Sequence, residues 1–151
     1  MSPAVTVICI VVICVSIVIW IKRKRDHDRL EMQQHSITPD ALHEILASNH
    51  ELLLFDVRQP LDLLADSEII PGAKRIPPKE VLNNPSLIPK EKDAVVYCTC
   101  PSDETSRRVL HRALAMHLLR VKFLKGGLAA WKAKGYPVEP YETPFHLDVR
   151  T

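Results

Sequence analysis

Glycine is scarce in this chain, which has four glycines and twelve prolines in 151 residues. Phosphate-binding loops and dinucleotide-binding turns need clustered glycines, so neither a Walker-type loop nor a dinucleotide fingerprint fits the sequence. Cysteine is also rare, and the four cysteines are too few and too unevenly placed for a disulfide scaffold. These absences exclude two common kinds of nucleotide-binding protein and the small disulfide-rich proteins.

Neither sign of charge dominates, with 20 basic and 18 acidic residues and a formal net charge of +2. Four of the basic residues are consecutive, at positions 22–25. The rest of the chain therefore carries a small acidic excess, and we expect no nucleic-acid partner. We also expect no cofactor.

The longest feature that is present is an apolar run from Pro3 to Ile21, made mostly of Ile and Val. As a helix this run spans roughly 28 Å, close to the hydrocarbon thickness of a bilayer at about 30 Å. A cleaved signal peptide carries its positive charge before the apolar run, whereas here Lys22–Arg25 follows it. A buried core helix is the other alternative. We predict a single-pass transmembrane anchor over residues 3–21.

The basic cluster after the apolar run also predicts the orientation of this anchor. Cytoplasmic flanks are enriched in Lys and Arg, so we expect the N-terminus outside and the chain after Arg25 in the cytoplasm. The expected location is the plasma (inner) membrane. Residues 22–36 then form a basic and polar juxtamembrane linker.

Beyond the linker, short apolar runs alternate with helical patterns. Strands are expected at 52–56, 74–76, 94–97 and 121–124, and helices from Pro39, at 59–65, at 102–119 and at 128–134. Thr38 is the expected N-cap of the first of these helices. In the helix over 102–119, one face should carry Val109, Leu110, Ala113, Leu114 and His117. Segment 77–93 reads as a proline-punctuated loop and 139–151 as an extended tail. The predicted fold is α/β, a small parallel sheet with helices on both faces.

A cysteine stands where one expected strand ends, in Tyr97-Cys98-Thr99-Cys100. Ligands of open α/β sheets bind beyond the carboxyl ends of strands, at helix N-termini. The backbone N–H groups there can lower the pKa of a thiol and receive an anion. A small buried residue at Cys98 is the alternative that this segment alone leaves open.

Four further motifs occur around this cysteine, in a fixed order. They are Asp-Val-Arg at 56–58, Ile-Pro-Gly-Ala at 70–73, Gly-Gly followed by Trp at 126–131, and Gly-Tyr-Pro-Val at 135–138. In order and spacing, these motifs and Tyr97-Cys98 resemble the rhodanese-like (sulfurtransferase) domain over about 37–138. Trp131 is expected in the core behind the Gly-Gly turn.

The resemblance implies that a cysteine thiolate takes a sulfane sulfur from a donor and passes it, as a persulfide, to a thiol or cyanide. Cys98 matches the nucleophile and persulfide carrier, with Cys100 as the alternative nucleophile or a resolving thiol. The substrate-binding loop then comprises Thr99, Pro101, Ser102, Asp103, Glu104, Thr105 and Arg107. Arg58 has a place near the rim of the site, and a structural salt bridge with Asp56 or Asp62 is its alternative role.

This loop departs from the family pattern, since eight residues separate Cys98 from Arg107 and the loop holds no glycine. Glu68-Ile69 also stands where the family usually has Gly-His. Asp103 and Glu104 suit a helix N-terminus, with Ser102 as its N-cap, but they repel anionic donors and raise the pKa of a nearby thiol. A low-molecular-weight persulfide or a protein persulfide is therefore a better candidate for the sulfur donor than thiosulfate. A doubly charged phosphoester is the poorest candidate for a substrate.

Two other classes of function remain open. One is a non-catalytic binding module that recognises a partner at the membrane. The other is a redox sensor that uses the Cys98–Cys100 pair as a reducible disulfide. No histidine stands at ligand spacing beside the pair, so no metal is expected. The expected partners are a small sulfur donor, a thiol acceptor, the membrane, and a protein persulfide donor or acceptor as a further option.

Overall fold

The computed structural model describes residues 2–48, 51–99 and 104–142. The chain divides into two compact units, Met1–Gln34 and His35–Thr151. The first unit is one helix, α1, which spans Pro3–Gln34. It covers the predicted anchor and continues through most of the predicted linker.

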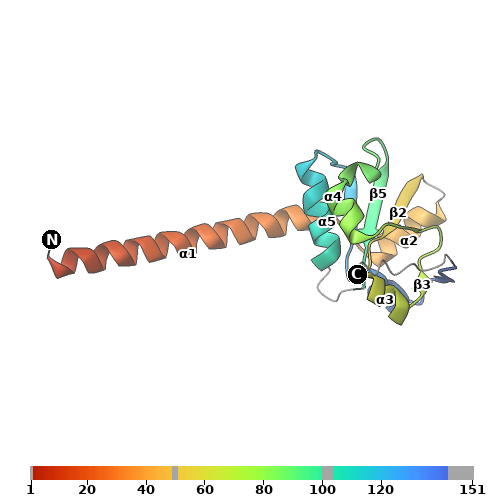
Figure 1. Cartoon of the computed structure of the whole chain (residues 1–151), viewed down its shortest axis with the longest axis horizontal. Coiled ribbons are helices and arrows are strands. Elements are labelled where there is room, and N and C mark those ends of the chain that lie inside the picture. The colour runs from red at the N-terminus through yellow and green to blue at the C-terminus, as the bar shows by residue number, and fades with distance from the viewer. Residues whose placement is uncertain (1, 49–50, 100–103, 143–151) are drawn as a thin grey trace, which may run out of the picture. The chain divides into compact units, whose positions relative to one another are not determined.

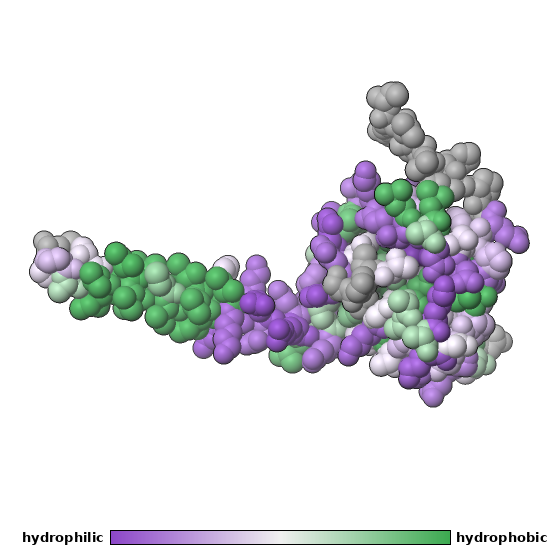
Figure 2. Space-filling model, turned by 90° about the horizontal axis from the view of Figure 1, so that it is seen from below, coloured by the Kyte–Doolittle hydropathy of each residue, from purple (hydrophilic) through white to green (hydrophobic). Residues whose placement is uncertain are grey.

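Helix α1 is long and apolar enough to cross a membrane, a property that signal sequences share. Figure 2 shows an apolar surface over its first part and a hydrophilic surface over the part that follows. The two polar residues of the apolar part bond within the helix, because Thr6 Oγ1 donates to Pro3 O and Ser16 Oγ to Val12 O, each at 2.8 Å. Both hydroxyl groups of the apolar part of α1 are therefore hydrogen-bonded within the helix.

The second unit is built on a five-stranded parallel sheet with the order β1-β6-β5-β2-β4. Its strands are β1 (Ser36–Ile37), β2 (Leu52–Asp56), β4 (Lys74–Arg75), β5 (Asp93–Tyr97) and β6 (Val121–Leu124). A small antiparallel sheet pairs β3 (Glu68–Ile69) with β7 (Glu139–Pro140). Strand β5 is central in the main sheet, and its end is level with the end of β2, since Tyr97 is opposite Asp56.

Helices connect the strands and flank the sheet (Figure 1). They are α2 (Pro39–Ala47), α3 (Pro60–Ala65), α4 (Pro78–Asn83), the 3₁₀ helix η1 (Pro85–Leu87), α5 (Glu104–Ala115) and α6 (Gly127–Ala133). Thr38 caps α2 as predicted, since its Oγ1 accepts from Ala41 N at 3.3 Å. The predicted α/β class with a parallel sheet and flanking helices is confirmed.

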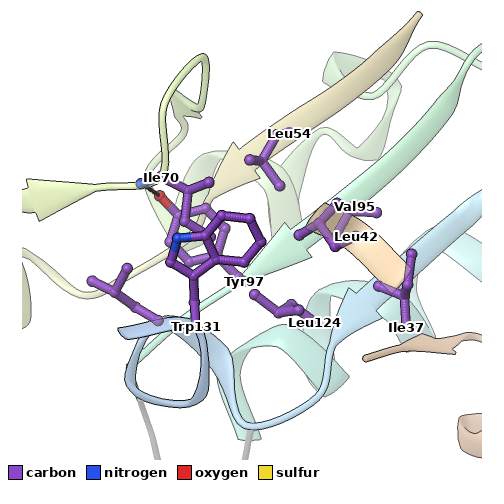
Figure 3. Packing of buried hydrophobic residues seen from close by; sticks show 9 residues of the cluster. Ile37, Leu42, Leu54, Ile70, Val95, Tyr97, Leu124 and Trp131 are labelled. Atoms are coloured by element: carbon purple, nitrogen blue, oxygen red, sulfur yellow. Dashed lines mark hydrogen bonds between the residues drawn. The ribbon is translucent and has the colours of Figure 1, made fainter. Parts of the chain in front are cut away.

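One hydrophobic cluster joins the sheet to α2 and α6 (Figure 3). Alternate residues of the central strands point into it, among them Leu54 of β2 and Val95 and Tyr97 of β5. Trp131 of α6 is 1% exposed within the cluster, and its Nε1 donates to Pro137 O at 2.8 Å. This confirms the predicted core position of Trp131 behind the Gly-Gly turn.

The structure corrects several sequence predictions. Helix α5 ends at Ala115, so His117 does not share its buried face; His117 is exposed and has φ +59. The predicted loop over 77–93 contains α4 and η1. The start of the predicted tail pairs with β3 as β7. Ser102, the predicted N-cap, lies outside the described residues.

Candidate functional site

Cys98 directly follows the central strand β5 and is fully buried. Two backbone hydrogen bonds hold the chain here: Val57 N donates to Tyr97 O at 3.0 Å, and Leu128 N donates to Cys98 O at 2.9 Å. The first bond ties the end of β5 to the residue after β2. The second ties Cys98 to the first turn of α6. The position of the cysteine is therefore fixed from two sides.

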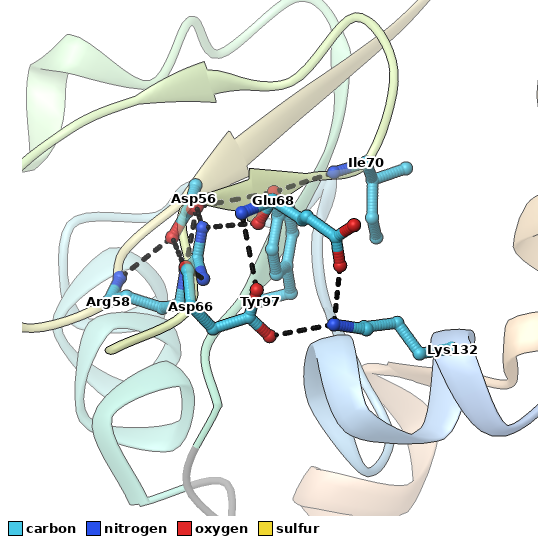
Figure 4. A network of polar contacts seen from close by, with 7 residues as sticks. All are labelled: Asp56, Arg58, Asp66, Glu68, Ile70, Tyr97 and Lys132. Atoms are coloured by element: carbon cyan, nitrogen blue, oxygen red, sulfur yellow. Dashed lines mark hydrogen bonds and ion pairs between the residues drawn. The ribbon is translucent and has the colours of Figure 1, made fainter. Parts of the chain in front are cut away.

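The side chain of Tyr97 adds a third tie at this edge of the sheet. Its hydroxyl donates to Asp56 Oδ2 at 3.3 Å and accepts from Ile70 N at 3.2 Å (Figure 4). Burial, together with the charge of Asp56, raises the pKa of the Tyr97 phenol. The hydroxyl consequently stays protonated and serves as a donor to the carboxylate.

Arg58 is the other partner of Asp56, and both side chains are fully buried. The guanidinium contacts Asp56 through Nε, at 3.0 and 2.8 Å from the two carboxylate oxygens, and through Nη2 at 2.6 Å from Oδ2. Nη1 donates to Asp66 O at 2.7 Å, and Nη2 also donates to Glu68 O at 2.8 Å. Figure 4 shows this network reaching from β2 across to β3.

These contacts establish the salt bridge between Arg58 and Asp56 that the sequence left as an alternative. The guanidinium holds the segment after α3 to the end of β2 through the two carbonyl groups. A role of Arg58 in binding substrate stays a prediction.

An outer ion pair supports the same segment. Lys132 Nζ of α6 lies 2.9 Å from Asp66 Oδ2 and 2.5 Å from Glu68 Oε2 (Figure 4). Partial burial raises the pKa of the Asp66 carboxyl, but hydrogen bonds from Lys132 and from the Glu68 N–H outweigh it, so the net effect is a lowered pKa. The hydrogen bonds of Lys132 to the carboxylates of Glu68, which has the larger effect, and of Asp66 raise the pKa of Lys132.

The remaining predicted site residues fall in three groups. Thr99 and Thr105 are half-buried. Glu104 and Arg107 are exposed on the first turn of α5. Cys100, Pro101, Ser102 and Asp103 lie outside the described residues.

Sequence reasoning missed Ser106, which is fully buried in the first turn of α5. It occupies an apolar position of the helix, three and four residues before the buried Val109 and Leu110. That pattern is a signal that the sequence already contains. Tyr97 had no such signal, because its hydroxyl partners come from distant segments.

Among the described residues, one group of side chains has the donor types and spacing to hold a metal ion. It consists of His27, Asp28 and Glu31, whose ligand atoms lie within 4.8 Å of one another on α1. These residues belong to the first unit, whereas Cys98 belongs to the second.

The second unit is thus an α/β domain whose central parallel strand leads directly into a buried cysteine. The family model for the rhodanese-like domain matches residues 38–134. A sulfurtransferase of Allochromatium vinosum is 31% identical over 104 residues, which is 69% of this chain and 94% of that protein. The chain belongs to the rhodanese-like domain family.

Solved structures agree with this assignment. A rhodanese-like domain from Anabaena superimposes with a TM-score of 0.60 at 26% identity, over 78% of this chain and 89% of that one. A rhodanese-like domain protein from Staphylococcus aureus gives a TM-score of 0.53 at 27% identity, over 64% and 89% of the two chains. The family and the sulfurtransferase relative together support a sulfurtransferase-type function.

Proposed function

We propose that this protein is a membrane-anchored sulfurtransferase that carries sulfane sulfur as a persulfide on Cys98. One observation carries the proposal: Cys98 follows the central strand of a rhodanese-like domain, and backbone hydrogen bonds from Val57 to Tyr97 and from Leu128 to Cys98 hold the chain there. In open α/β sheets the N-terminal end of the helix that follows a strand lies at the carboxyl end of that strand. Partial positive charge at such an end favours the thiolate and an anionic persulfide.

The transfer has two balanced steps. In the first, the Cys98 thiolate attacks the outer sulfur of a donor persulfide, a new S–S bond forms at Cys98, and the donor's S–S bond breaks. The donor leaves as a thiolate with the electron pair of the broken bond. In the second, an acceptor thiolate attacks the outer sulfur of the Cys98 persulfide and releases the Cys98 thiolate. Cyanide can replace the acceptor thiol, and thiocyanate is then released.

Charge near the thiol favours persulfide donors over thiosulfate. Glu104 is exposed on the first turn of α5, and Asp103 precedes it in the sequence. Like charges repel a doubly charged donor more strongly than a neutral or singly charged one. We therefore propose low-molecular-weight persulfides or a persulfide on another protein as donors. Arg107, exposed on the same turn, is the candidate to attract the remaining negative charge.

Helix α1 is the basis for the proposed membrane location of the enzyme. Its apolar part matches the length of a bilayer core, and the basic residues 22–25 follow directly. We propose a single-pass anchor in the plasma (inner) membrane, with the domain on the cytoplasmic side. That side is reducing, which keeps the site cysteines as thiols.

Intact-mass spectrometry of the full chain in detergent, before and after a low-molecular-weight persulfide, tests the proposal. Sulfur transfer predicts a gain of about 32 Da that cyanide removes. A loss of about 2 Da instead indicates a Cys98–Cys100 disulfide and a redox sensor. No change in mass indicates a non-catalytic binding module.

Matched single variants locate the sulfur. Cys98→Ala should abolish the cyanide-labile gain, whereas Cys100→Ala should keep it. Sulfur loading that survives Cys98→Ala and is lost in Cys100→Ala would reject Cys98 as the carrier. Peptide mapping separates both sites from Cys9 and Cys14 of α1.

A further inference from the structure

Basic residues are unevenly distributed in the second unit. Positions 105–138 contain eight basic residues and no acidic residue, whereas the other positions after residue 25 contain eight basic and 18 acidic residues. Three of the eight are neutralised within the fold, because Arg120, Lys132 and Lys134 pair with acidic side chains. Three of the other five belong to helix α5.

The exposed face of α5 is basic. It carries Arg107, Arg108, His111 and Arg112, all of them exposed, while the opposite face packs against β5 and β6. Glu104, the first residue of the helix, is its only acidic residue. The helix therefore presents three arginines and one histidine to its surroundings after a single acidic side chain.

The neighbouring residues leave this positive charge in place. In the part of the chain that the structure describes, no acidic side chain pairs with Arg108. Arg112 Nε donates to Leu82 O at 3.2 Å, a contact with a neutral carbonyl group. Helix α4, which contacts α5, adds one exposed charge of each sign, Lys79 and Glu80. The surface around α5 thus keeps a net positive charge in a unit that is otherwise acidic.

Two large apolar side chains are exposed just after α5. Met116 directly follows the helix and is 40% exposed, and Leu119 is 66% exposed. Met116 comes four residues after Arg112 and eight after Arg108, the spacing of neighbours along one helix face. Basic residues beside exposed apolar residues are typical of surfaces that lie in a membrane interface, where the apolar groups enter the headgroup region and the basic groups attract anionic lipids.

The chain length between the apolar span and the second unit is short. The second unit begins at His35, and the nine residues 26–34 that precede it belong to α1. As helix these nine residues extend about 14 Å. So short a connection keeps the domain at a high effective concentration of lipid headgroups, and weak contacts with them are then sufficient for binding.

We propose that the exposed face of α5, together with Met116 and Leu119, docks onto the anionic phospholipid headgroups of the membrane in which α1 is anchored. The inference rests on the proposed anchor and goes beyond it, because it gives the domain itself a second contact with the membrane. The cytoplasmic leaflet carries a negative surface potential, which suits the proposed orientation. Anionic lipids repel the acidic remainder of the domain, so docking selects this face.

A reversal of charge on α5 measures the contribution of the arginines. One Lys or Arg near an anionic surface strengthens binding about fivefold. Arg108→Glu removes one such charge and adds a repelled one, so it should weaken docking more than about fivefold, and Arg108→Gln should weaken it about fivefold. Lys74→Glu is the matched control, because it makes the same change of charge at an exposed position of β4.

The test uses the full chain in lipid nanodiscs made of phosphatidylcholine, with and without phosphatidylglycerol. Co-elution of the chain with the nanodiscs tests the anchor. The rate at which hydrogen peroxide converts Met116 to its sulfoxide, followed by peptide mass spectrometry, measures docking, because a side chain in the headgroup region is shielded from the oxidant. Sodium chloride is added in a parallel series to screen the charges. Circular dichroism checks that each variant is folded.

Met116 of the wild type and of Lys74→Glu should be oxidised several-fold more slowly when phosphatidylglycerol is present. Arg108→Glu and added salt should each remove this protection, and Arg108→Gln should reduce it. Equal oxidation in both lipids by a chain that co-elutes with the nanodiscs overturns the inference and leaves the anchor standing. Protection that persists in folded Arg108→Glu also overturns it. If the chain does not co-elute, the proposed anchor fails and the inference fails with it.

A soluble acidic polymer distinguishes lipid from an acidic protein as the occupant of this face. Polyglutamate is added to the chain in phosphatidylcholine nanodiscs, and oxidation of Met116 is measured in the same way. Protection by polyglutamate without protection by phosphatidylglycerol would assign the face to an acidic protein and would overturn the inference.

Discussion

Asp56 and Arg58 show how single residues organise the edge of the sheet from which the site is built. Their ion pair is fully buried, and the guanidinium also serves two backbone carbonyls. Desolvation of two charges offsets much of the attraction between them, so such a pair adds little net stability over an apolar replacement. Removal of one partner is different, because it leaves the other as an uncompensated buried charge.

Arg58→Ala should therefore destabilise the domain by about 3–5 kcal/mol. Urea denaturation followed by Trp131 fluorescence measures this loss, in a Trp20→Phe background that leaves one tryptophan. Arg120→Ala is the control, because Arg120 forms a similar pair with Asp93 that is about half exposed. Exposed pairs contribute less than about 1 kcal/mol. Equal losses in the two variants would show that burial of the Asp56–Arg58 pair has no energetic consequence.

The contacts of Lys132 predict a dependence of stability on pH. The pKa of Asp66 is lowered in the folded state, so its contribution is present above the unfolded value of 3.8 and is lost as pH falls through the lower folded pKa. The difference in unfolding free energy between wild type and Lys132→Met should be constant near neutral pH and shrink below pH ~4. Urea denaturation across pH 3–7 measures it, and a difference that grows on acidification would contradict the prediction.

At the residue scale, the sequence identified side chains better than their partners. Cys98 and Arg58 could be singled out because each follows an apolar strand in a recognisable motif. The contact of Arg58 with the carbonyls of Asp66 and Glu68 depends on how the chain returns after α3, which no local pattern encodes. Only the buried apolar stripe around Ser106 carried a signal that could have been used.

At the element scale, length decided what could be predicted. Strands β2 and β5 have five residues each and show continuous apolar runs, whereas β1, β3 and β7 have two residues each and are too short for any periodicity. Strand β4 is equally short, and it could be predicted only because the turn at Pro71-Gly72 and the prolines 77 and 78 bound it on both sides. Helix α4 was missed because Pro77-Pro78 reads as a strand end. Proline is also common in the first turn of a helix, because an N–H group there would have no carbonyl partner within the helix; Pro78 is the first residue of α4.

The turn before α6 gives a prediction for this scale. Gly126 has φ +75, and a Cβ there would lie 2.6 Å from the Cβ of Ala130, so Gly126→Ala is both strained and overpacked. Gly135 has φ +73 with open space around it. We expect Gly135→Ala to cost about 1–2 kcal/mol and Gly126→Ala clearly more, measured by urea denaturation.

The shift of this turn in Gly126→Ala should also affect sulfur loading of Cys98. Leu128 in the first turn of α6 donates to Cys98 O, so a shift of this turn moves the support of the cysteine. Gly126→Ala should slow sulfur loading, whereas Gly135→Ala should leave it near the wild-type rate. Equal loading by both variants would show that the α6 turn does not position Cys98.

At the scale of the whole molecule, the basic cluster at 22–25 belongs to the proposed anchor and not to the rhodanese-like domain. The four consecutive basic residues 22–25 account for the net positive charge of the chain. They follow the apolar part of α1 within the same helix. In the proposed topology this placement has two consequences: the cluster ends the apolar span, and it biases the side of the membrane that the domain occupies.

Exchange of this charge bias should invert the protein in the membrane. A variant with glutamine at positions 22–25 and four lysines inserted before Pro3 carries the same net charge on the opposite flank of the span. Because Lys and Arg are retained on the cytoplasmic side, we expect its domain to become accessible to protease from outside intact spheroplasts, whereas the wild-type domain should be digested only in inverted vesicles. The glutamine substitutions alone serve as the control and should give a mixed orientation. If the domain stays protected in spheroplasts when the charges are exchanged, the basic cluster does not set the topology, and the cytoplasmic placement of Cys98 loses its physical basis.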